Sequence, residues 1–369
     1  MFINRLLGML IILFFCIAAK DNSKLSADRT IAFKRAKSLD NGVSVSWLEQ
    51  IWNNDILDKS VIKMADLKLL KQLGFKSIRL PVAFEHFQTN NDSMQKALKH
   101  VDETFRLCEL YGFKLVICYH SGSFNENNYS DETSEIADMW TVIAKRYIHK
   151  NPDNLFFELY NEPPHMDPNI WKNAADNIIA AIRKIDKNRT LIVGASNFNS
   201  IYELSRTTPL GDDNLIYTFH FYEPFFFTHQ GSSWVGDQDA TTGVPFPYDA
   251  EKFPPLNPKA KNTWGETNYH QYSRDGNEQS VKDKLQIVKN WAVKYNVPIL
   301  CGEYGVYNKY ADLDSRCRYI KAVRQNLKAM NMPGVLWDYN SNFSIFDGEP
   351  TIKNLPDCMK DAIGFTAKK

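Results

Sequence analysis

The sequence has almost no excess of charge of either sign. Its 369 residues include 44 basic and 43 acidic side chains, so the formal net charge is +1. A nucleic-acid-binding protein needs a positive field that attracts phosphates, and this composition offers none. Nucleic acid is therefore not an expected partner. The length and the hydrophobic fraction of 44% suffice for one large barrel or two ordinary domains.

Cysteine is scarce and irregularly spaced. One of the six cysteines, Cys16, lies in an apolar run at the N-terminus, and the others are Cys108, Cys118, Cys301, Cys317 and Cys358. These five have neither the spacing of a metal site nor the density of a disulfide framework. Cys118 and Cys301 lie inside strand-like apolar runs, which favours buried, small hydrophobic residues. The presence of one or two disulfides stays an open alternative, and the sequence alone does not show which cysteines would pair.

Motifs for several other chemistries are missing. No glycine-rich phosphate turn follows either early strand-like run, at Ser46-Trp47-Leu48 or at Leu80-Pro81-Val82. His220 and His229 lack an H-E-x-x-H pattern or clustered aspartates, and no G-x-S-x-G elbow surrounds Ser123 or Ser196. We therefore expect no metal, no cofactor and no serine nucleophile.

Residues 1–19 have the pattern of a signal peptide. Arg5 precedes an apolar run that ends at Phe15, and the small residues Ala18 and Ala19 precede a polar segment. A membrane anchor is a weaker alternative because the run is shorter than the ~20 apolar residues of a spanning helix. Phe14 and Phe15 are bulkier than a lipoprotein signal at Cys16 would favour. We expect a secreted protein without membrane association after signal removal, with a mature domain over residues 20–369.

Strand-like apolar runs alternate with amphipathic segments along most of the chain. This alternation is typical of a parallel sheet with crossover helices. Eight such runs can be counted: Gly42–Trp47, Ser77–Val82, Lys114–His120, Leu155–Tyr160, Thr190–Ala195, Leu215–Tyr222, Pro298–Glu303 and Gly334–Tyr339. Eight units in one chain of this size predict a single (β/α)8 TIM barrel in the α/β class. A doubly wound sheet is the competing architecture, and the missing glycine-rich turn argues against it.

One connection, from Glu223 to about Gly276, is unusually long. It is rich in proline, glycine and aromatic residues and has no clear helical period. A loop of this length in a compact domain is usually functional, and after the sixth strand it belongs to the active-site face of a barrel. Two interpretations stay open. Trp234 and Trp264 could wall a cleft for several sugar units, or the aromatic residues could form a small core of their own.

Polar or aromatic side chains stand at the ends of six predicted strands. They are Arg79, His120, Asn161 with Glu162, His220 with Tyr222, Glu303, and Trp337. Strand ends converge on one face of a barrel, where catalytic groups collect. The two glutamates would then meet at one rim, and burial of an unpaired carboxylate costs on the order of several kcal/mol. Such a pair is suited to cleavage of a glycosidic bond.

These motifs, in this order, resemble glycoside hydrolase family 5, the cellulase family. They are I-R-L-P at 78–81, the strand ending in His120, L-Y-N-E-P at 159–163, H-F-Y at 220–222, G-E-Y-G at 302–305 and Trp337. The resemblance implies that Glu162 is the general acid and base and that Glu303 is the nucleophile of a retaining reaction. The two carboxyl groups should then lie ~5 Å apart.

The resemblance also implies roles for the supporting residues. Arg79 and Tyr222 would hold the pKa of Glu303 low, and Asn161 would bind the sugar 2-hydroxyl. His120 and His220 would contact sugar hydroxyls or orient the glutamates. Trp337 would stack on a pyranose ring, although a barrel-core position stays open for it. Trp47, at the end of the first strand, fits a sugar platform, and Glu49 beside it is only a possible sugar contact.

Glu158 is close to the predicted acid and could be mistaken for it. Alternation from Leu155 to Glu162 places Glu158 on the same side of the strand as Glu162 but lower in the barrel, so we assign it a structural role.

The predicted function is an endo-acting β-1,4-glucanase that acts as a monomer on a polysaccharide or oligosaccharide. Other substrates within the resemblance are β-mannan, xyloglucan, lichenan and β-1,3-glucan, because specificity resides in the loops. A carbohydrate-binding barrel without catalysis is a remote alternative, and transfer to a sugar acceptor in place of water is another.

Overall fold

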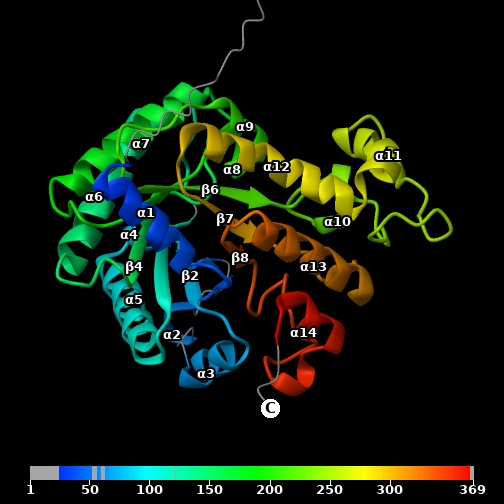
Figure 1. Ribbon diagram of the computed structural model, residues 1–369, viewed down its shortest axis with the longest axis horizontal. Helices are drawn as coiled ribbons and strands as arrows, with labels where there is room; N and C mark the ends of the chain where they lie inside the picture. The colour runs from blue at the N-terminus through cyan, green and yellow to red at the C-terminus, as the bar shows by residue number, and fades with distance from the viewer. Residues whose placement is uncertain (1–24, 52–55, 60–62, 121, 366–369) are drawn as a thin grey trace, which may run out of the picture.

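Eight parallel strands close into a barrel in the computed structural model, which describes residues 25–51, 56–59, 63–120 and 122–365. The strands are β1 (Gly42–Ser44), β2 (Ser77–Val82), β3 (Lys114–Tyr119), β4 (Leu155–Glu158), β5 (Leu191–Val193), β6 (Leu215–Phe221), β7 (Ile299–Tyr304) and β8 (Gly334–Leu336). Each strand pairs with the next, and β8 pairs with β1. The predicted (β/α)8 barrel is confirmed (Figure 1). The predicted signal peptide at residues 1–19, with Cys16, lies outside the described residues.

Helices of the crossover connections surround the barrel (Figure 1). They and the additional helices are α1 (Ala27–Ser38), α2 (Ile56–Lys59), α3 (Met64–Gln72), α4 (Phe84–Gln88), α5 (Asn91–Tyr111), α6 (Tyr129–Tyr147), α7 (Pro168–Arg183), α8 (Ser196–Asn199), α9 (Ile201–Arg206), α10 (Phe225–Thr228), α11 (Trp264–Asp275), α12 (Glu278–Tyr295), α13 (Leu313–Ala329) and α14 (Asp357–Ile363), with short 3₁₀ turns η1 (Asp237–Asp239), η2 (Pro258–Ala260) and η3 (Ile352–Asn354). In the described residues no helix is long and apolar enough to span a bilayer.

Helix α7 illustrates why these segments are helical. Asp167 caps its first turn by accepting a hydrogen bond from the Asn169 amide, and Pro168 fits the first helical position, where no amide donor is needed. Its apolar residues recur at a spacing of three and four, and the face they form is buried: Trp171, Ala174, Ala175, Ile178, Ile179 and Ile182.

An apolar layer fills one end of the barrel. Six strands contribute one residue each, and Ala36 and Leu39 from α1 and its C-terminal end pack against them. The strand residues are Val116, Phe156, Ile192, Ile216, Leu300 and Val335. Glu158 lies two residues beyond Phe156 at the carboxyl end of β4, and the Arg79 side chain on β2 binds it there. The charged groups are therefore concentrated at one end of the barrel, as the position of strand ends predicts.

The connection between β6 and α12, residues 222–277, forms an insert beside the barrel (Figure 1). Although the sequence shows no clear helical period in this connection, α11 is a regular helix of 12 residues. Thr263 caps this helix by accepting a hydrogen bond from the Gly265 amide. Only Gly265 and Tyr272 of α11 are buried, so the helix carries no apolar stripe that periodicity could reveal.

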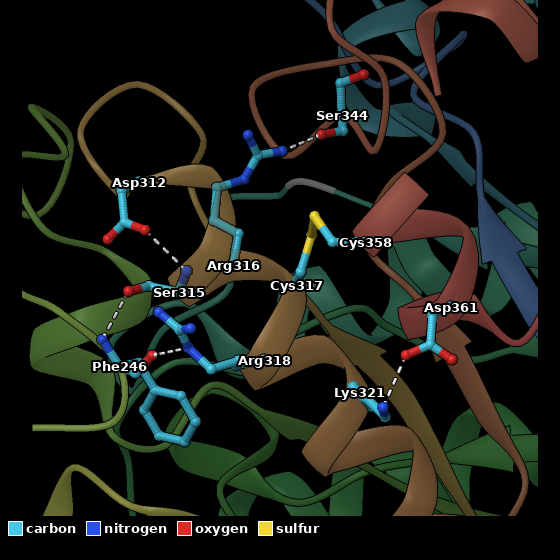
Figure 2. Close-up of a disulfide and its surroundings, with 10 residues drawn as sticks. All are labelled: Phe246, Asp312, Ser315, Arg316, Cys317, Arg318, Lys321, Ser344, Cys358 and Asp361. Carbon is cyan, nitrogen blue, oxygen red and sulfur yellow. Dashed lines mark hydrogen bonds and ion pairs between the residues drawn. A yellow bond between two sulfur atoms is a disulfide. The ribbon is translucent and has the colours of Figure 1, made fainter. Parts of the chain in front are cut away.

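A disulfide between Cys317 and Cys358 joins α13 to α14 (Figure 2). The same helix α13 also holds the insert, because the Ser315 hydroxyl accepts a hydrogen bond of 2.9 Å from the Phe246 amide and Arg318 donates one of 3.1 Å to the Phe246 carbonyl (Figure 2). Cys108, Cys118 and Cys301 are free and buried. The disulfide anchors the last helix of the described chain to the barrel wall.

Candidate active site

The buried guanidinium of Arg79 organises the floor of the site. It lies on β2 and is fully buried. Its Nε and Nη2 donate to the two oxygens of Glu158 at 2.7 and 2.9 Å. Nη1 donates to Glu303 Oε1 at 2.6 Å, and Nη2 also donates to Asn161 Oδ1 at 2.6 Å. One cation thus binds two carboxylates and an amide from two different strand ends, those of β4 and β7, which compensates part of the cost of burying them.

Glu158 is a structural partner of Arg79, as its position in the sequence predicted. It is fully buried at the end of β4. The predicted alternation up to Glu162 is wrong, because β4 ends at Glu158 and Tyr160 turns away from the barrel to stack on Tyr119, with ring centroids 5.6 Å apart. The loop that follows carries Asn161 and Glu162 over the rim.

Glu303 is held at both carboxylate oxygens. Oε1 accepts from Arg79, and Oε2 accepts from the Tyr222 hydroxyl at 2.7 Å. The residue lies within β7 near its end and is only 4% exposed. The expectation of a low pKa was wrong in direction: burial raises the pKa of Glu303, and the charges of His220 and Arg79 with the Tyr222 hydrogen bond offset this only in part.

Glu162 lies close to Glu303 in a more open position. Its side chain is 31% exposed, and its Oε1 is 2.6 Å from His220 Nδ1. The same imidazole nitrogen is 3.4 Å from Glu303 Oε2. One carboxylate oxygen of Glu162, one of Glu303 and one ring nitrogen of His220 all lie within 4.8 Å of one another. The two carboxyl groups separated by 141 residues of sequence therefore meet at one point of the rim.

His220, at the end of β6, links the two glutamates. Burial acts to lower its pKa, but the charges of Glu303 and Glu162 outweigh burial, so the pKa is raised. Its other ring nitrogen, Nε2, is 3.3 Å from the amide nitrogen of Asn199. Nε2 accepts a hydrogen bond from that amide in the neutral tautomer, which places the proton on Nδ1, as in the cation. Nδ1 therefore directs a hydrogen toward Glu162 in both forms.

Asn199 was missed in the sequence. It follows β5, the strand for which no strand-end residue was predicted, and its side chain is fully buried. Its amide nitrogen donates to the Asn161 carbonyl as well as approaching His220. Gly194 allows this approach, because a Cβ there would lie 1.7 Å from Asn199 Oδ1. A cluster of asparagines after the fifth strand was the available signal.

His120 and Trp337 form a parallel stack next to Arg79. Their ring centroids are 5.8 Å apart and the planes differ by 4°, and the Arg79 guanidinium is 6.0 Å from the Trp337 ring. Burial, with the nearby charges of Arg79 and His220, lowers the pKa of His120 to about 3, so this ring is neutral. Trp337 is partly exposed, so the alternative of a barrel-core position does not apply to it.

Trp47 and Glu49 lie beyond the end of β1, which is shorter than predicted and ends at Ser44. Trp47 is partly exposed and packs edge-on against Tyr339 at 6.5 Å. Glu49 is buried, and burial, followed by the charge of Asp338, raises its pKa to about 8. Trp47 is therefore available to a ligand near the site, while the Glu49 carboxyl is protonated at neutral pH.

A cavity of about 790 Å³ opens beside Glu162. Its wall combines the loop after β5 with the insert, and its main lining residues are Glu162, Phe198, Tyr202, His220, Tyr222, Phe225, Trp234 and Trp264. Trp264, on α11, is 45% exposed and packs edge-on against Phe225 at 5.8 Å. Cavities of this volume accommodate ligands of several rings.

The aromatic insert forms a small core of its own with some residues and lines the cavity with others, while the binding of sugar units there stays a prediction. Phe226, Phe253, Tyr269 and Tyr272 pack together, with the Phe253 and Tyr272 rings parallel at 5.5 Å, and form a small core. Trp234 and Trp264 instead remain half-exposed in the cavity wall. The insert thus has a rigid base and an aromatic surface that faces the site.

Comparison with known proteins places the chain in a group of polysaccharide-degrading enzymes. Residues 36–343 match the family model described as cellulase (glycosyl hydrolase family 5). The chain is 32% identical over 364 residues to Endoglucanase 3 of Fibrobacter succinogenes, with 91% of this chain and 55% of that protein covered. It is 28% identical over 348 residues to Endoglucanase C of Acetivibrio thermocellus, with 89% and 98% covered. The chain thus spans about half of the first relative and nearly all of the second.

A solved structure shares the same architecture. Cel5A of Thermotoga maritima, in complex with mannotriose, superposes with a TM-score of 0.72 at 25% identity, and 90% of this chain and 99% of that chain are covered.

Proposed function

The chain belongs to glycosyl hydrolase family 5, the cellulase family, and on this premise we propose that it is an endo-acting β-1,4-glucanase with a retaining mechanism. Glu303 is the nucleophile and Glu162 is the general acid and base. The observation that carries this proposal is that one carboxylate oxygen of Glu162 and one of Glu303 lie within 4.8 Å of each other. Retaining glycosidases place their carboxyl groups ~5–5.5 Å apart, whereas inverting enzymes need ~6.5–9.5 Å to fit a water between them.

In the first step a Glu303 oxygen attacks the anomeric carbon and the bond to the leaving sugar breaks. Both Glu303 oxygens are oriented before substrate arrives, by Arg79 and by Tyr222. Such preorganisation reduces the reorganisation that the reaction requires. Glu162 gives its proton to the departing glycosidic oxygen, so that the sugar leaves as a neutral alcohol.

In the second step water attacks the glycosyl ester and Glu162 accepts the proton of that water. The released carboxylate of Glu303 returns to its two donors. His220 lies 2.6 Å from Glu162 and 3.4 Å from Glu303, so its charge and hydrogen bond favour whichever glutamate is ionised. His220 thereby supports the change of role of Glu162 between the two steps.

The supporting residues bind the sugar that is attacked. Trp337 presents a partly exposed ring beside the glutamates, and a pyranose C–H face packs well on such a surface. Asn161 accepts a hydrogen bond from Arg79, and in this proposal it binds the sugar 2-hydroxyl. The neutral His120 can contact a further hydroxyl. Trp47 and Trp264 extend the aromatic surface in two directions along the substrate.

The substrate class rests on the relatives. Endoglucanase 3 and Endoglucanase C bear the names of enzymes that cleave glucan chains internally. β-Mannan is the second candidate, because Thermotoga maritima Cel5A was solved with mannotriose. Xyloglucan, lichenan and β-1,3-glucan are further members of the same substrate class. The enzyme acts on the polymer as a monomer and needs no cofactor.

Export from the cytoplasm is part of the proposal. Disulfides form and persist in oxidising compartments, so the Cys317–Cys358 disulfide supports export. The signal-peptide pattern of residues 1–19 also supports export from the cytoplasm. The mature enzyme is a secreted protein that is not bound to a membrane.

A substrate panel tests the proposal. Carboxymethyl cellulose, glucomannan and laminarin are incubated with the enzyme, products are sized, and the anomer that forms first is identified by NMR. We expect cleavage of carboxymethyl cellulose to oligosaccharides with a β-anomer as the first product. Cleavage of glucomannan without glucan cleavage would transfer the assignment to mannan. An α-anomer would refute the retaining mechanism, and the absence of turnover on all three would favour a binding protein.

A further inference from the structure

Three consecutive residues after β5 have left-handed backbone conformations. The φ angles of Asn197, Phe198 and Asn199 are 58°, 60° and 54°. Asparagine tolerates this region, but a bulky residue such as phenylalanine seldom adopts it. A backbone of this kind persists only where its surroundings hold it, and it is found most often at functional sites. The segment, labelled α8, lies beside β6, the strand that carries His220 (Figure 1).

The loop that carries Glu162 holds this turn. The Asn197 amide donates to the Pro164 carbonyl at 3.0 Å, and the Phe198 amide donates to the Pro163 carbonyl at 2.8 Å. Glu162 directly precedes Pro163, so the turn and the proposed acid belong to one hydrogen-bonded unit. The last residue of the turn is fully buried within this unit.

The carboxamide of Asn199, the last residue of the turn, is oriented by its nitrogen. One hydrogen of Nδ2 is donated to the Asn161 carbonyl, and the other is directed at His220 Nε2, 3.3 Å away. The carbonyl can only accept, so the carboxamide nitrogen lies on this side. Oδ1 has no hydrogen-bond partner among the described residues and lies next to Gly194. Burial of an unpaired amide oxygen costs free energy, which the nitrogen contacts and the close packing at Gly194 must offset.

The contact with Asn199 decides which ring nitrogen of His220 carries the hydrogen in the neutral form. Nε2 accepts from Asn199, so Nδ1 is the donor, and it lies 2.6 Å from Glu162 Oε1. In the other neutral tautomer, Nε2 would carry the hydrogen and face the hydrogens of the carboxamide, which is a repulsive contact. Nδ1 would then be an acceptor next to Glu162. Asn199 disfavours this tautomer although no hydrogen bond joins it to either glutamate in the described part of the chain.

The two tautomers differ in what happens to the proton of the acid. A protonated Glu162 beside an accepting Nδ1 directs its hydrogen at the imidazole, where a leaving group does not reach it. Beside a donating Nδ1, Oε1 of Glu162 accepts a hydrogen bond, and the acid proton is on Oε2. Glu162 lines the cavity of about 790 Å³, so a proton on Oε2 is available to a substrate there.

We propose that Asn199 is a positioning residue for the general acid: through His220 it keeps the proton of Glu162 on the oxygen that the imidazole does not bind. The same carboxamide fixes the loop of the acid, because it also binds the Asn161 carbonyl. This inference rests on the proposed role of Glu162 as general acid and base.

The ionisable groups near His220 come from several elements: Glu162, Glu303, Arg79 and His120. Burial acts to lower the pKa of His220, but the charges of the two glutamates outweigh burial and the charge of Arg79. In the cation, Nε2 also carries a hydrogen and meets those of the Asn199 carboxamide, so Asn199 favours the neutral ring. A hydrogen-bond acceptor at position 199 would instead favour the cation or the other tautomer.

The main test, Asn199→Asp, replaces the donor by an acceptor of the same shape. A ring that donates from Nε2 is either the other tautomer, which accepts from the acid, or a cation, which favours the ionised acid. Relative to an aryl cellobioside with an acidic phenol, kcat/KM for cellohexaose should therefore fall by ~10-fold, part of the ~10²–10⁴-fold that general acid catalysis supplies. The basic limb of kcat/KM for cellohexaose should move to lower pH.

NMR of the protein with isotopically labelled histidine nitrogens shows the tautomer directly. The signals of His220 are those that are missing from His220→Gln. Above the pH at which the ring titrates, we expect hydrogen on Nδ1 in the unchanged enzyme and on Nε2 in Asn199→Asp. Asn199→Ala removes the donor without adding a charge, so it should show both tautomers and a smaller loss of the kinetic ratio. It also decides the question if the aspartate variant does not fold.

Asn296→Asp is the matched control. Asn296 has a left-handed φ of 52° at the C-terminal end of α12 and lies outside the cavity lining, so it tests aspartate in this backbone conformation. It should change neither the kinetic ratio nor the basic limb. An unchanged Nδ1 tautomer in the Asn199 variants, or equal losses for both substrates, would overturn the inference. Failure of Glu162→Ala to distinguish the same two substrates would instead refute the proposed acid itself.

Discussion

Glu303 and Glu162 are the same residue type in two different surroundings. Glu303 lies within a strand, has a 5% exposed side chain and has a donor at each oxygen. Glu162 lies on a loop, has a 31% exposed side chain and has His220 at one oxygen. A nucleophile must hold one geometry through the reaction, and a general acid must exchange its proton with substrate and water. The comparison explains how neighbours, and not residue type, distinguish the two carboxyl groups in their proposed roles.

The largest effect is expected on replacement of Glu303, the glutamate that is held at both oxygens. Glu303→Gln keeps the shape but removes the nucleophile, so kcat should fall by at least ~10⁴-fold. Steady-state kinetics on cellohexaose measures this loss, and circular dichroism checks that the barrel remains folded. Residual activity within tenfold of the unchanged enzyme would show that another group attacks the sugar.

The second prediction concerns Glu162, the more exposed of the two glutamates. The loss of activity on its replacement should depend on the substrate. Glu162→Ala removes proton donation, so kcat/KM for cellohexaose should fall by ~10²–10⁴-fold. Aryl cellobiosides with acidic phenols should lose far less in the first step, because their leaving groups need no proton. Pre-steady-state measurements separate that step from the second one. Equal losses of the first step for both substrates would contradict the role of acid and base.

Loss of one donor sharpens the description of the Glu303 side. Tyr222→Phe removes one hydrogen bond to a charged carboxylate and keeps the Arg79 contact, so kcat/KM should fall by ~10–100-fold, as expected for ~1.5–3 kcal/mol. Tyr202→Phe is a control, because Tyr202 also lines the cavity but no hydrogen bond joins it to either glutamate among the described residues. An equal loss in the control would assign the effect to cavity shape.

The pH dependence gives the smallest effect. Glu303 must be ionised to attack, and burial raises its pKa above the ordinary glutamate value of 4.5. Activity should therefore be lost as the pH falls through this raised pKa, at a pH above 4.5. Because the Tyr222 hydrogen bond lowers the pKa of Glu303, Tyr222→Phe should move this acid limb of kcat/KM to higher pH. A limb that moves to lower pH would contradict the assignment of the limb to Glu303.

Much of the barrel could be predicted from the sequence, because eight apolar runs carry a signal that does not depend on the rest of the fold. Every predicted run overlaps a strand, and Arg79, Glu303 and Trp337 come together as expected. The ends of the strands were less certain: β1 stops at Ser44 and β4 at Glu158. Loop residues after these points follow tertiary contacts rather than strand alternation.

Features that depend on three-dimensional contact were not predictable. The left-handed turn at residues 197–199 is held by carbonyls of another loop, and the polar helix α11 has no apolar stripe. The pairing of Cys317 with Cys358 depends on how α13 meets α14. The raised pKa of Glu303 arises from the extent of its burial, and the sequence shows which residues are expected near Glu303 but not how deeply it is buried. In each case the feature depends on a distance between two segments or on how deeply a side chain is buried.

The most direct measurement of the central claim is chemical trapping of the sugar on the enzyme. A 2-deoxy-2-fluoro cellobioside with an activated leaving group reacts in the first step of a retaining mechanism and is released slowly in the second. Mass spectrometry of the digested enzyme should find one added fluorinated disaccharide on the peptide that contains Glu303, and Glu303→Gln should remain unlabelled. A label on Glu162, or turnover without any covalent adduct and with inversion at the anomeric carbon, would contradict the account.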